Sequence, residues 1–241
     1  MKDLPATRHS IVAAVRSDEP EVRRGGLDTL IGVYWKPVYK YLRLKWHASD
    51  EEARDLTQEF FTRAIEKRFF DTFDPARGRF RTFLRTCVDR FAANERKAER
   101  RLKRGGDHGI VPLDFETAEG ELRQHDSPVP ADFDEYFHRE WIRSLLSLAV
   151  DDLREAYVRQ GKTVQFRIFQ AYDLADPAAG RPPTYATVAG QFGVAVTDVT
   201  NYLANARRTF RGLLLDRLRA ICADSVEFEA EARQLLRGGL R

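Results

Sequence analysis

The chain has 241 residues, a length that permits one large hydrophobic core or two smaller ones. Apolar residues make up 43% of the sequence, including 16 Phe, 8 Tyr and 3 Trp, which is enough to build such cores. No uncharged apolar run reaches the roughly 18 residues of a spanning helix, and the N-terminus lacks the features of a secretory signal. We therefore expect a cytoplasmic protein that does not enter a membrane.

Recognisable catalytic and metal-binding motifs are missing from the sequence. The five His residues are scattered without metal-ligand spacing, and Cys87 and Cys222 lie too far apart for a metal knuckle or a disulfide framework. We find no nucleophile motif and no Gly-rich phosphate loop. We expect no catalytic residue, no metal site and no cofactor, and therefore a protein that is not an enzyme.

Charge is distributed unevenly along the chain, although the net charge is only +3. The segment from Arg77 to Arg104 holds eleven Lys or Arg residues against three acidic residues, a composition that attracts polyanions. The segment from Asp107 to Glu140 reverses this balance, with ten acidic residues against two Arg. We expect the first segment to seek nucleic acid and the second to avoid it.

Helical periodicity dominates the first half of the chain. Ser49 followed by Glu52 forms a capping-box pattern, which predicts a helix start. Pro37 predicts an interruption or a restart of the helix that contains it. The predicted helices cover residues 8–24, 27–47, 50–67 and 80–103, with a break between Asp71 and Arg79.

The second half begins after a stretch that resembles a solvated linker. Residues 105–134 combine Gly, Pro, Asp and Glu with weak periodicity. Helical periodicity resumes at about Phe133 and continues through Tyr172 to a Pro-rich turn. Two helices with a tight joint follow, and the tail from Asp224 is either a regulatory helix or a frayed end. The sequence therefore predicts an all-α fold of two helical domains joined by an acidic linker.

The tight joint has the pattern of a helix-turn-helix. The first helix presents Tyr185, Val188, Ala189 and Phe192 on one face, and Gly193 permits the left-handed turn that ends it. Val194 and Val196 are expected to fill the turn, and Thr197 is the expected N-cap of the second helix. That helix would bury Val199, Tyr202, Leu203, Ala206 and Phe210 and turn polar side chains outward. Such a face suits the major groove of DNA, although a surface helix hairpin remains the alternative.

Aromatic residues interleave with arginines in and around the basic helix predicted from Phe80. Phe69, Phe70, Phe73, Phe80, Phe83 and Phe91 alternate with several Arg residues, a mixture that can bind phosphates and stack on the bases of an opened strand. Most of these phenylalanines fit a helical core better than a stacking surface. The residues alone therefore leave open whether this helix binds nucleic acid.

Two segments of the chain resemble a known family. The stretches ARDLTQEFFTRAIEK (Ala53 to Lys67) and GRFRTFLRTCVDRFAANERKAERR (Gly78 to Arg101) resemble region 2 of bacterial sigma factors of the extracytoplasmic-function group. The helix-turn-helix is similar to region 4 of the same family. The two matches cover roughly 150 residues in the family's order, so the resemblance implies a sigma factor, which directs RNA polymerase to promoters.

The resemblance assigns three sets of residues. The DLxQExF pattern implies docking on the clamp coiled coil of core RNA polymerase by Asp55, Leu56, Gln58, Glu59 and Phe61. The resemblance also implies the beta flap as a polymerase partner, without assigning residues to it. The FRTWL-type motif and the loop before it imply melting and reading of the −10 element by Asp74, Arg77, Arg79, Phe80, Arg81, Thr82, Phe83, Arg85, Arg90, Asn94 and Lys97. Region 4 implies −35 binding by Thr184, Tyr185, Thr197, Asp198, Thr200, Asn201, Asn205, Arg207, Arg208 and Arg211.

Some positions depart from the family pattern. Phe83 replaces the commoner Trp, Thr187 stands where many members carry Glu, and Asn205 where Arg is usual. Arg90 and Asn94 stand where Asn and Asp are common. These changes leave the promoter sequence open.

The predicted domains follow from this resemblance. They are an N-terminal helical extension (1–24), region 2 (25–104), an acidic linker (105–135), region 4 (136–222) and a C-terminal tail (223–241). The expected partners are core RNA polymerase and promoter DNA, with an anti-sigma factor as a further candidate. Two alternatives stay open: a stand-alone helix-turn-helix regulator, and an adaptor or anti-sigma protein that touches polymerase but not DNA.

Overall fold

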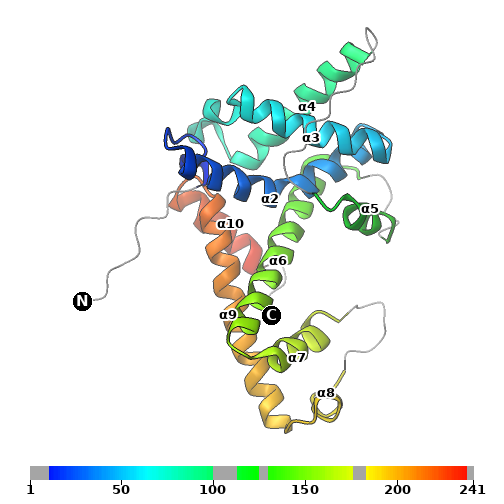
Figure 1. Ribbon diagram of the computed structural model, residues 1–241, viewed down its shortest axis with the longest axis vertical. Helices are drawn as coiled ribbons and strands as arrows, with labels where there is room; N and C mark the ends of the chain where they lie inside the picture. The colour runs from blue at the N-terminus through cyan, green and yellow to red at the C-terminus, as the bar shows by residue number, and fades with distance from the viewer. Residues whose placement is uncertain (1–10, 100–112, 125–129, 176–182, 238–241) are drawn as a thin grey trace, which may run out of the picture. The chain divides into compact units, whose positions relative to one another are not determined.

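The computed structural model describes residues 11–99, 113–124, 130–175 and 183–237, and within these ranges every regular element is a helix (Figure 1). This confirms the all-α prediction. The described helices fall into two compact units. The first contains residues up to Ser144 together with those from Leu218 onward, and the second contains Leu145–Arg217.

The first unit is built around a long, deeply buried helix. Helix α1 (Ile11–Ala14) ends in a short turn, and α2 (Pro20–Lys45) follows. Helix α2 runs through Pro37 without a break, contrary to the predicted interruption. Proline removes one backbone hydrogen bond from a helix, but Pro37 is itself buried and most of its neighbours in α2 pack on other helices. Tertiary packing thus maintains α2 across this position.

The next helices carry the segments that resemble sigma region 2. Helix α3 (Asp50–Glu66) begins with the predicted capping box, in which Ser49 accepts from the Glu52 amide and the Glu52 carboxylate accepts from the Ser49 amide. Two short 3-10 helices, η1 (Phe69–Thr72) and η2 (Pro75–Arg77), form the connection to α4 (Phe80–Glu99). The core between these helices contains Leu30, Tyr34, Phe60, Phe80, Leu84 and Val88, all at most 2% exposed.

The predicted linker contains a packed helix. Helix α5 (Phe115–Gln124) lies against α2, where the Phe115 ring sits 5.4 Å from the Trp35 ring and 5.3 Å from the Tyr39 ring. The expectation that this whole stretch is solvated is therefore wrong for residues 115–124. The acidic composition of this stretch is typical of a linker. It was misleading because the basic partners of the acidic residues of α5 lie about 80 residues earlier in the chain.

Two long helices have residues in both units. Helix α6 (Phe133–Arg159) has its first half in the first unit, and α9 (Val196–Ile221) has its last turn there. The second unit also contains α7 (Thr163–Asp173) and α8 (Tyr185–Phe192). The division at Ser144 differs from the predicted boundary at residue 136, because the first half of α6 packs on α2. Ser144, for example, donates a 2.8 Å hydrogen bond to the Val33 carbonyl.

The C-terminal tail is a helix rather than a frayed end. Helix α10 (Ser225–Arg237) belongs to the first unit. The Asp224 carboxylate accepts from the Glu227 amide, and the Glu227 carboxylate accepts from the Ala223 amide at 2.8 Å. These local bonds satisfy backbone donors at the start of α10. The region from residue 223 is thus part of the fold of the first unit.

Candidate nucleic-acid interface

The residues predicted to bind polymerase divide into an outer and an inner group. Asp55 is exposed, and Leu56, Gln58 and Glu59 are half-buried. Phe61 is 2% exposed and packs 5.2 Å from the Phe60 ring. Phe61 therefore packs in the core beneath α3 and is not accessible to a polymerase surface. The polar members of the motif line the accessible side of the helix.

The loop before α4 is held in place by aromatic side chains. Phe73 is buried and lies 5.1 Å from the Phe80 ring, while Arg16 donates to the Phe73 carbonyl. At the tip, the Asp74 carboxylate accepts from the Ala76 amide at 3.0 Å. Arg77, with 87% of its side chain exposed, pairs with Asp74 at 3.3 Å. The loop thus presents an exposed cation and an exposed carboxylate on a rigid aromatic base.

Phe80 and Phe83 differ in what they can contact. Phe80 is 2% exposed and touches the rings of Tyr34 and Phe70 as well as Phe73, so its predicted role as a direct DNA contact is not compatible with this packing. Phe83 is half-buried, with its ring 5.4 Å from that of Phe73. Phe83 is therefore the better placed of the two for stacking on a base.

One side of α4 carries an exposed polar stripe. Thr82, Arg90, Asn94 and Lys97 are exposed and lie three, four or eight residues apart. Helical geometry puts residues at these spacings on one face. The stripe combines two cations with short hydrogen-bonding side chains, a composition suited to a nucleic-acid strand.

Arg85, three residues after Thr82, is bound to other side chains of the first unit. Its guanidinium donates to the Asp89 carboxylate at 3.1 Å and to the Tyr41 hydroxyl at 3.2 Å. The same carboxylate also accepts from Lys45 at 3.0 Å and from the Trp46 indole at 3.1 Å. Arg85 was predicted to contact DNA, but here it helps to attach the end of α2 to α4.

Arg79 and Arg81 are also engaged within the chain. Both guanidinium groups pair with the carboxylate of Glu231 on α10. Glu231 is 2% exposed. No motif in the sequence identified Glu231 as part of this region. The sequence signal that could have indicated an acidic helix face here is the spacing of Glu227 and Glu231, which lie four residues apart.

In the second unit, α8 and α9 form the predicted helix-turn-helix. Thr184 caps α8 by accepting from the Thr187 amide at 3.1 Å. Gly193 ends α8 with φ +65°, the left-handed conformation that glycine adopts without a steric penalty. Val188 and Ala189 on α8 and Val199 and Leu203 on α9 are buried, as the sequence pattern predicts.

Helix α9 begins two residues earlier than expected for a Thr197 cap. It starts at Val196, and the Asp198 carboxylate accepts from the Ala195 amide at 3.3 Å. Thr197 is therefore inside the first turn, and Val196 is 47% exposed rather than buried in the joint. The sequence suggested Thr197 because threonine is a common cap, but Asp198 performs part of the capping from within the helix.

The predicted −35 residues are exposed in part. Thr197, Thr200, Asn201, Arg208 and Arg211 are exposed along α9. Arg207 is exposed too, with 44% of its side chain accessible, and it pairs with Asp173 at 2.7 Å. The Asn205 amide donates to the Tyr157 hydroxyl at 3.2 Å, and Tyr185 packs 4.9 Å from the Tyr172 ring. The Asp173 hydrogen bonds raise the pKa of Arg207. These three side chains support the fold of the unit in this state.

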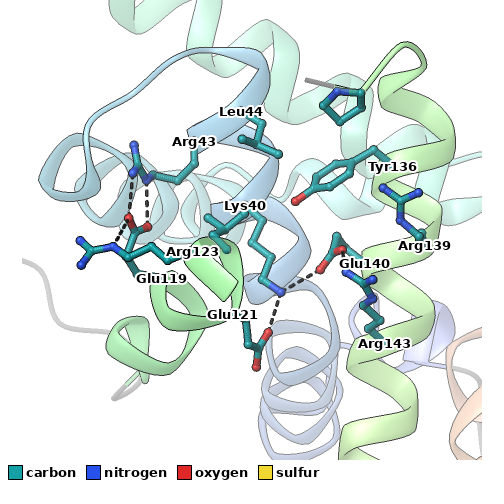
Figure 2. Close-up of a pocket in the computed structure, with 12 residues that line it drawn as sticks. Lys40, Arg43, Leu44, Glu119, Glu121, Arg123, Tyr136, Arg139, Glu140 and Arg143 are labelled. Carbon is teal, nitrogen blue, oxygen red and sulfur yellow. Dashed lines mark hydrogen bonds and ion pairs between the residues drawn. The ribbon is translucent and has the colours of Figure 1, made fainter. Parts of the chain in front are cut away.

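A pocket of about 260 Å³ lies among α2, α5 and the start of α6 (Figure 2). The Lys40 ammonium, 4% exposed, binds Glu140 at 2.8 Å and also contacts Glu121. Nearby, the Arg43 guanidinium binds Glu119 at 2.8 Å. The buried charged side chains on its walls pair with one another, and these ion pairs connect the three helices. The pocket walls therefore offer no buried charge that requires a ligand as its partner.

Two classes of site receive no support from the described part of the chain. No group of three or more His, Cys, Asp or Glu side chains there is arranged to hold a metal ion. Among the same residues, no helix is both long and apolar enough to cross a membrane.

Comparison with known families gives one match, which lies within the first unit. Residues 30–102 match the family model of sigma-70 region 2, so the chain contains a sigma-70 region 2 domain. The match covers α3, the loop and α4 together with most of α2. Searches of curated proteins and of solved structures gave no match. This part of the chain is therefore similar to region 2 of sigma-70 factors.

Proposed function

Starting from the sigma-70 region 2 domain, we propose that this protein is a sigma factor of the extracytoplasmic-function group, which binds core RNA polymerase and directs it to promoters. The observation that carries the proposal is the family match over residues 30–102, where the polar faces of α3 and α4 are exposed. Catalysis belongs to the polymerase, so the factor itself needs no cofactor. It would act in the cytoplasm.

The proposal gives each surface a separate task. The outer side of α3 (Asp55, Leu56, Gln58 and Glu59) docks on the polymerase clamp through polar contacts. Region 2, assigned to residues 25–104, opens the −10 element, with the stripe on α4 binding the strand and the loop around Asp74 and Arg77 receiving an extruded base. Region 4, assigned to residues 136–222, reads the −35 element with Thr200 and Asn201 at base edges and Arg208 and Arg211 at phosphates.

Reconstitution with bacterial core polymerase tests the polymerase contact. Asp55→Asn removes a charge from the docking surface without changing its shape, and Glu66→Gln makes the same change at an exposed residue near the end of α3, outside the motif. We expect Asp55→Asn to weaken core binding about tenfold, since hydrogen bonds to charged groups contribute more than neutral ones. Glu66→Gln should bind as the parent chain does. A parent chain that does not associate with core polymerase would refute the proposal.

A stand-alone DNA-binding regulator remains the second candidate, because a helix-turn-helix such as α8 and α9 can bind DNA without polymerase. Such a regulator would bind a duplex operator tightly by itself and would not support run-off transcription. A sigma factor gives the opposite pattern. Selection of promoter DNA by the reconstituted holoenzyme separates the two and identifies the −10 and −35 sequences.

A further inference from the structure

Helix α10 places a buried carboxylate between two arginines of the proposed −10 segment. The Glu231 carboxylate lies 2.7 Å from Arg79 and also pairs with Arg81. Arg79 and Arg81 flank Phe80 at the start of α4. Only 2% of the Glu231 side chain and 12% of the Arg81 side chain are exposed, so solvent screens this pair weakly, whereas the Arg79 side chain is 41% exposed.

Further contacts attach α10 to the same part of the first unit. Leu235 is buried, and the Gln234 amide lies 3.1 Å from the His138 ring nitrogen. His138 stacks 5.6 Å from Trp141, and the Arg81 guanidinium lies 5.1 Å from the centre of the Trp141 ring. The position of α10 is therefore defined by apolar, polar and ionic contacts together.

The chemistry of the two arginines makes this contact relevant to DNA. A guanidinium binds carboxylate and phosphate oxygens with similar geometry, so a carboxylate held against Arg79 and Arg81 occupies the position that a phosphate would take. The exposed stripe on α4 and Arg77 remain accessible while α10 is in place. Helix α10 therefore withholds two cations of this segment and leaves the others available.

We propose that α10 is an intramolecular cover for the start of α4, in which the Glu231 carboxylate competes with the phosphates of a promoter strand for Arg79 and Arg81. This inference rests on the proposed sigma function. Opening of the −10 element then requires displacement of α10. The cover makes the free chain a weaker binder of single-stranded DNA than its basic segment would otherwise allow.

Two substitutions on the same helix test the cover. Glu231→Gln removes the competing charge, and Glu229→Gln makes the same change at an exposed residue that pairs with Arg233 within α10. The probe is a fluorescently labelled, mixed-sequence single-stranded oligonucleotide, titrated with the full-length chain and followed by anisotropy. We expect Glu231→Gln to bind about tenfold more tightly, which corresponds to about 1.4 kcal/mol. Glu229→Gln should match the parent chain.

The salt dependence of binding provides a second measurement. Two additional phosphate contacts should steepen the slope of log K against log salt by about 1.4 for a single strand. Deletion of residues 225–241, in a chain whose remaining helices are shown to persist by circular dichroism, should reproduce both effects without depending on the side chain at residue 231. Core binding should be unchanged in all variants, because Asp55 and its neighbours lie outside this contact.

The outcomes separate the cover from the sigma assignment. If Glu231→Gln and the deletion both bind the oligonucleotide no more tightly than Glu229→Gln while core binding is intact, the cover is refuted and the sigma assignment stands. If the parent chain fails to bind core polymerase, the sigma assignment is refuted, whatever the oligonucleotide shows. Tighter binding by both Glu231→Gln and the deletion supports the cover.

Discussion

Glu119 on α5 shows how a single carboxylate attaches a helix. It accepts hydrogen bonds from the Arg43 guanidinium at 2.8 and 3.0 Å and from the Tyr39 hydroxyl at 2.6 Å. The hydrogen bonds from Arg43, followed by the one from Tyr39, outweigh the effect of burial and lower the pKa of Glu119 to about 2. The ionised form is therefore the one that holds α5 on α2.

The shifted pKa predicts a specific acid sensitivity. A carboxyl whose pKa is lower in the folded chain stabilises it above the ordinary pKa of 4.5, and this contribution disappears as pH falls toward about 2. The difference amounts to roughly 3 kcal/mol. We expect Glu119→Gln to remove this part of the pH dependence of the unfolding free energy, measured by denaturant titration. Glu116→Gln, at an exposed residue of α5, should leave it unchanged.

Individual contacts of this kind were not predictable from the sequence. Glu119 lies 76 residues from Arg43, and Glu231 lies 150 residues from Arg81. No local pattern connects such partners. The family resemblance also placed Arg85 and Arg207 among the DNA contacts, whereas Asp89, four residues further along α4, pairs with Arg85 and Asp173 pairs with Arg207. The family motifs indicated which polar residues could bind DNA. Only the fold determines which of these side chains are not already paired within the chain.

At the scale of elements, α1 and α2 approach each other closely at Gly26. A Cβ atom there would lie 2.8 Å from the Ala14 Cβ and 3.0 Å from the Val15 backbone nitrogen. These distances are shorter than ordinary contacts, so one of the two segments would have to move. Gly26 thus permits α1 to rest directly on the backbone of α2.

Two alanine substitutions in α2 should therefore have opposite effects. We expect Gly26→Ala to lower the free energy of unfolding by about 1–3 kcal/mol through overpacking. Gly32→Ala, where a Cβ would meet nothing within 4 Å, should raise it by up to about 1 kcal/mol because alanine favours helix more than glycine does. Thermal or denaturant unfolding of both variants checks the pair. Equal effects would contradict the close contact at residue 26.

The elements themselves were largely predictable. The capping box at Ser49 and Glu52 marked the start of α3, and Gly193 marked the end of α8. These signals are local, since they depend on backbone groups within a few residues. Pro37 and the acidic stretch before Phe133 misled the prediction, because distant packing maintains α2 through a proline and folds α5 onto it.

At the scale of the whole molecule, each unit carries a separate polar face proposed to bind DNA. The stripe on α4 belongs to the first unit, and the exposed residues of α9 belong to the second. Distant sites with no shared partners contribute nearly additively to binding. Substitutions in α9 should therefore change recognition of the upstream element alone.

Two substitutions in α9 distinguish phosphate from base contacts. We expect Arg208→Ala to weaken holoenzyme binding to a matched promoter and to make the slope of log K against log salt shallower by about 0.9. Asn201→Ala should leave the slope unchanged and lower the preference for the matched upstream sequence by about 1–3 kcal/mol. Binding titrations at several salt concentrations, on matched and altered promoters, measure both. Identical salt slopes for Arg208→Ala and the parent chain would count against the phosphate contact.

The Tyr39 hydroxyl has a consequence for how α5 and α3 depend on each other. It lies 2.6 Å from the Glu119 carboxylate and 2.6 Å from the Asp50 carboxylate in the first turn of α3. A phenol has one proton, so at any instant it donates to one of these two acceptors. If one carboxylate moves away, the hydroxyl donates its hydrogen bond to the other alone. The first turn of α3 and the attachment of α5 to α2 thus compete for the hydrogen bond of a single hydroxyl.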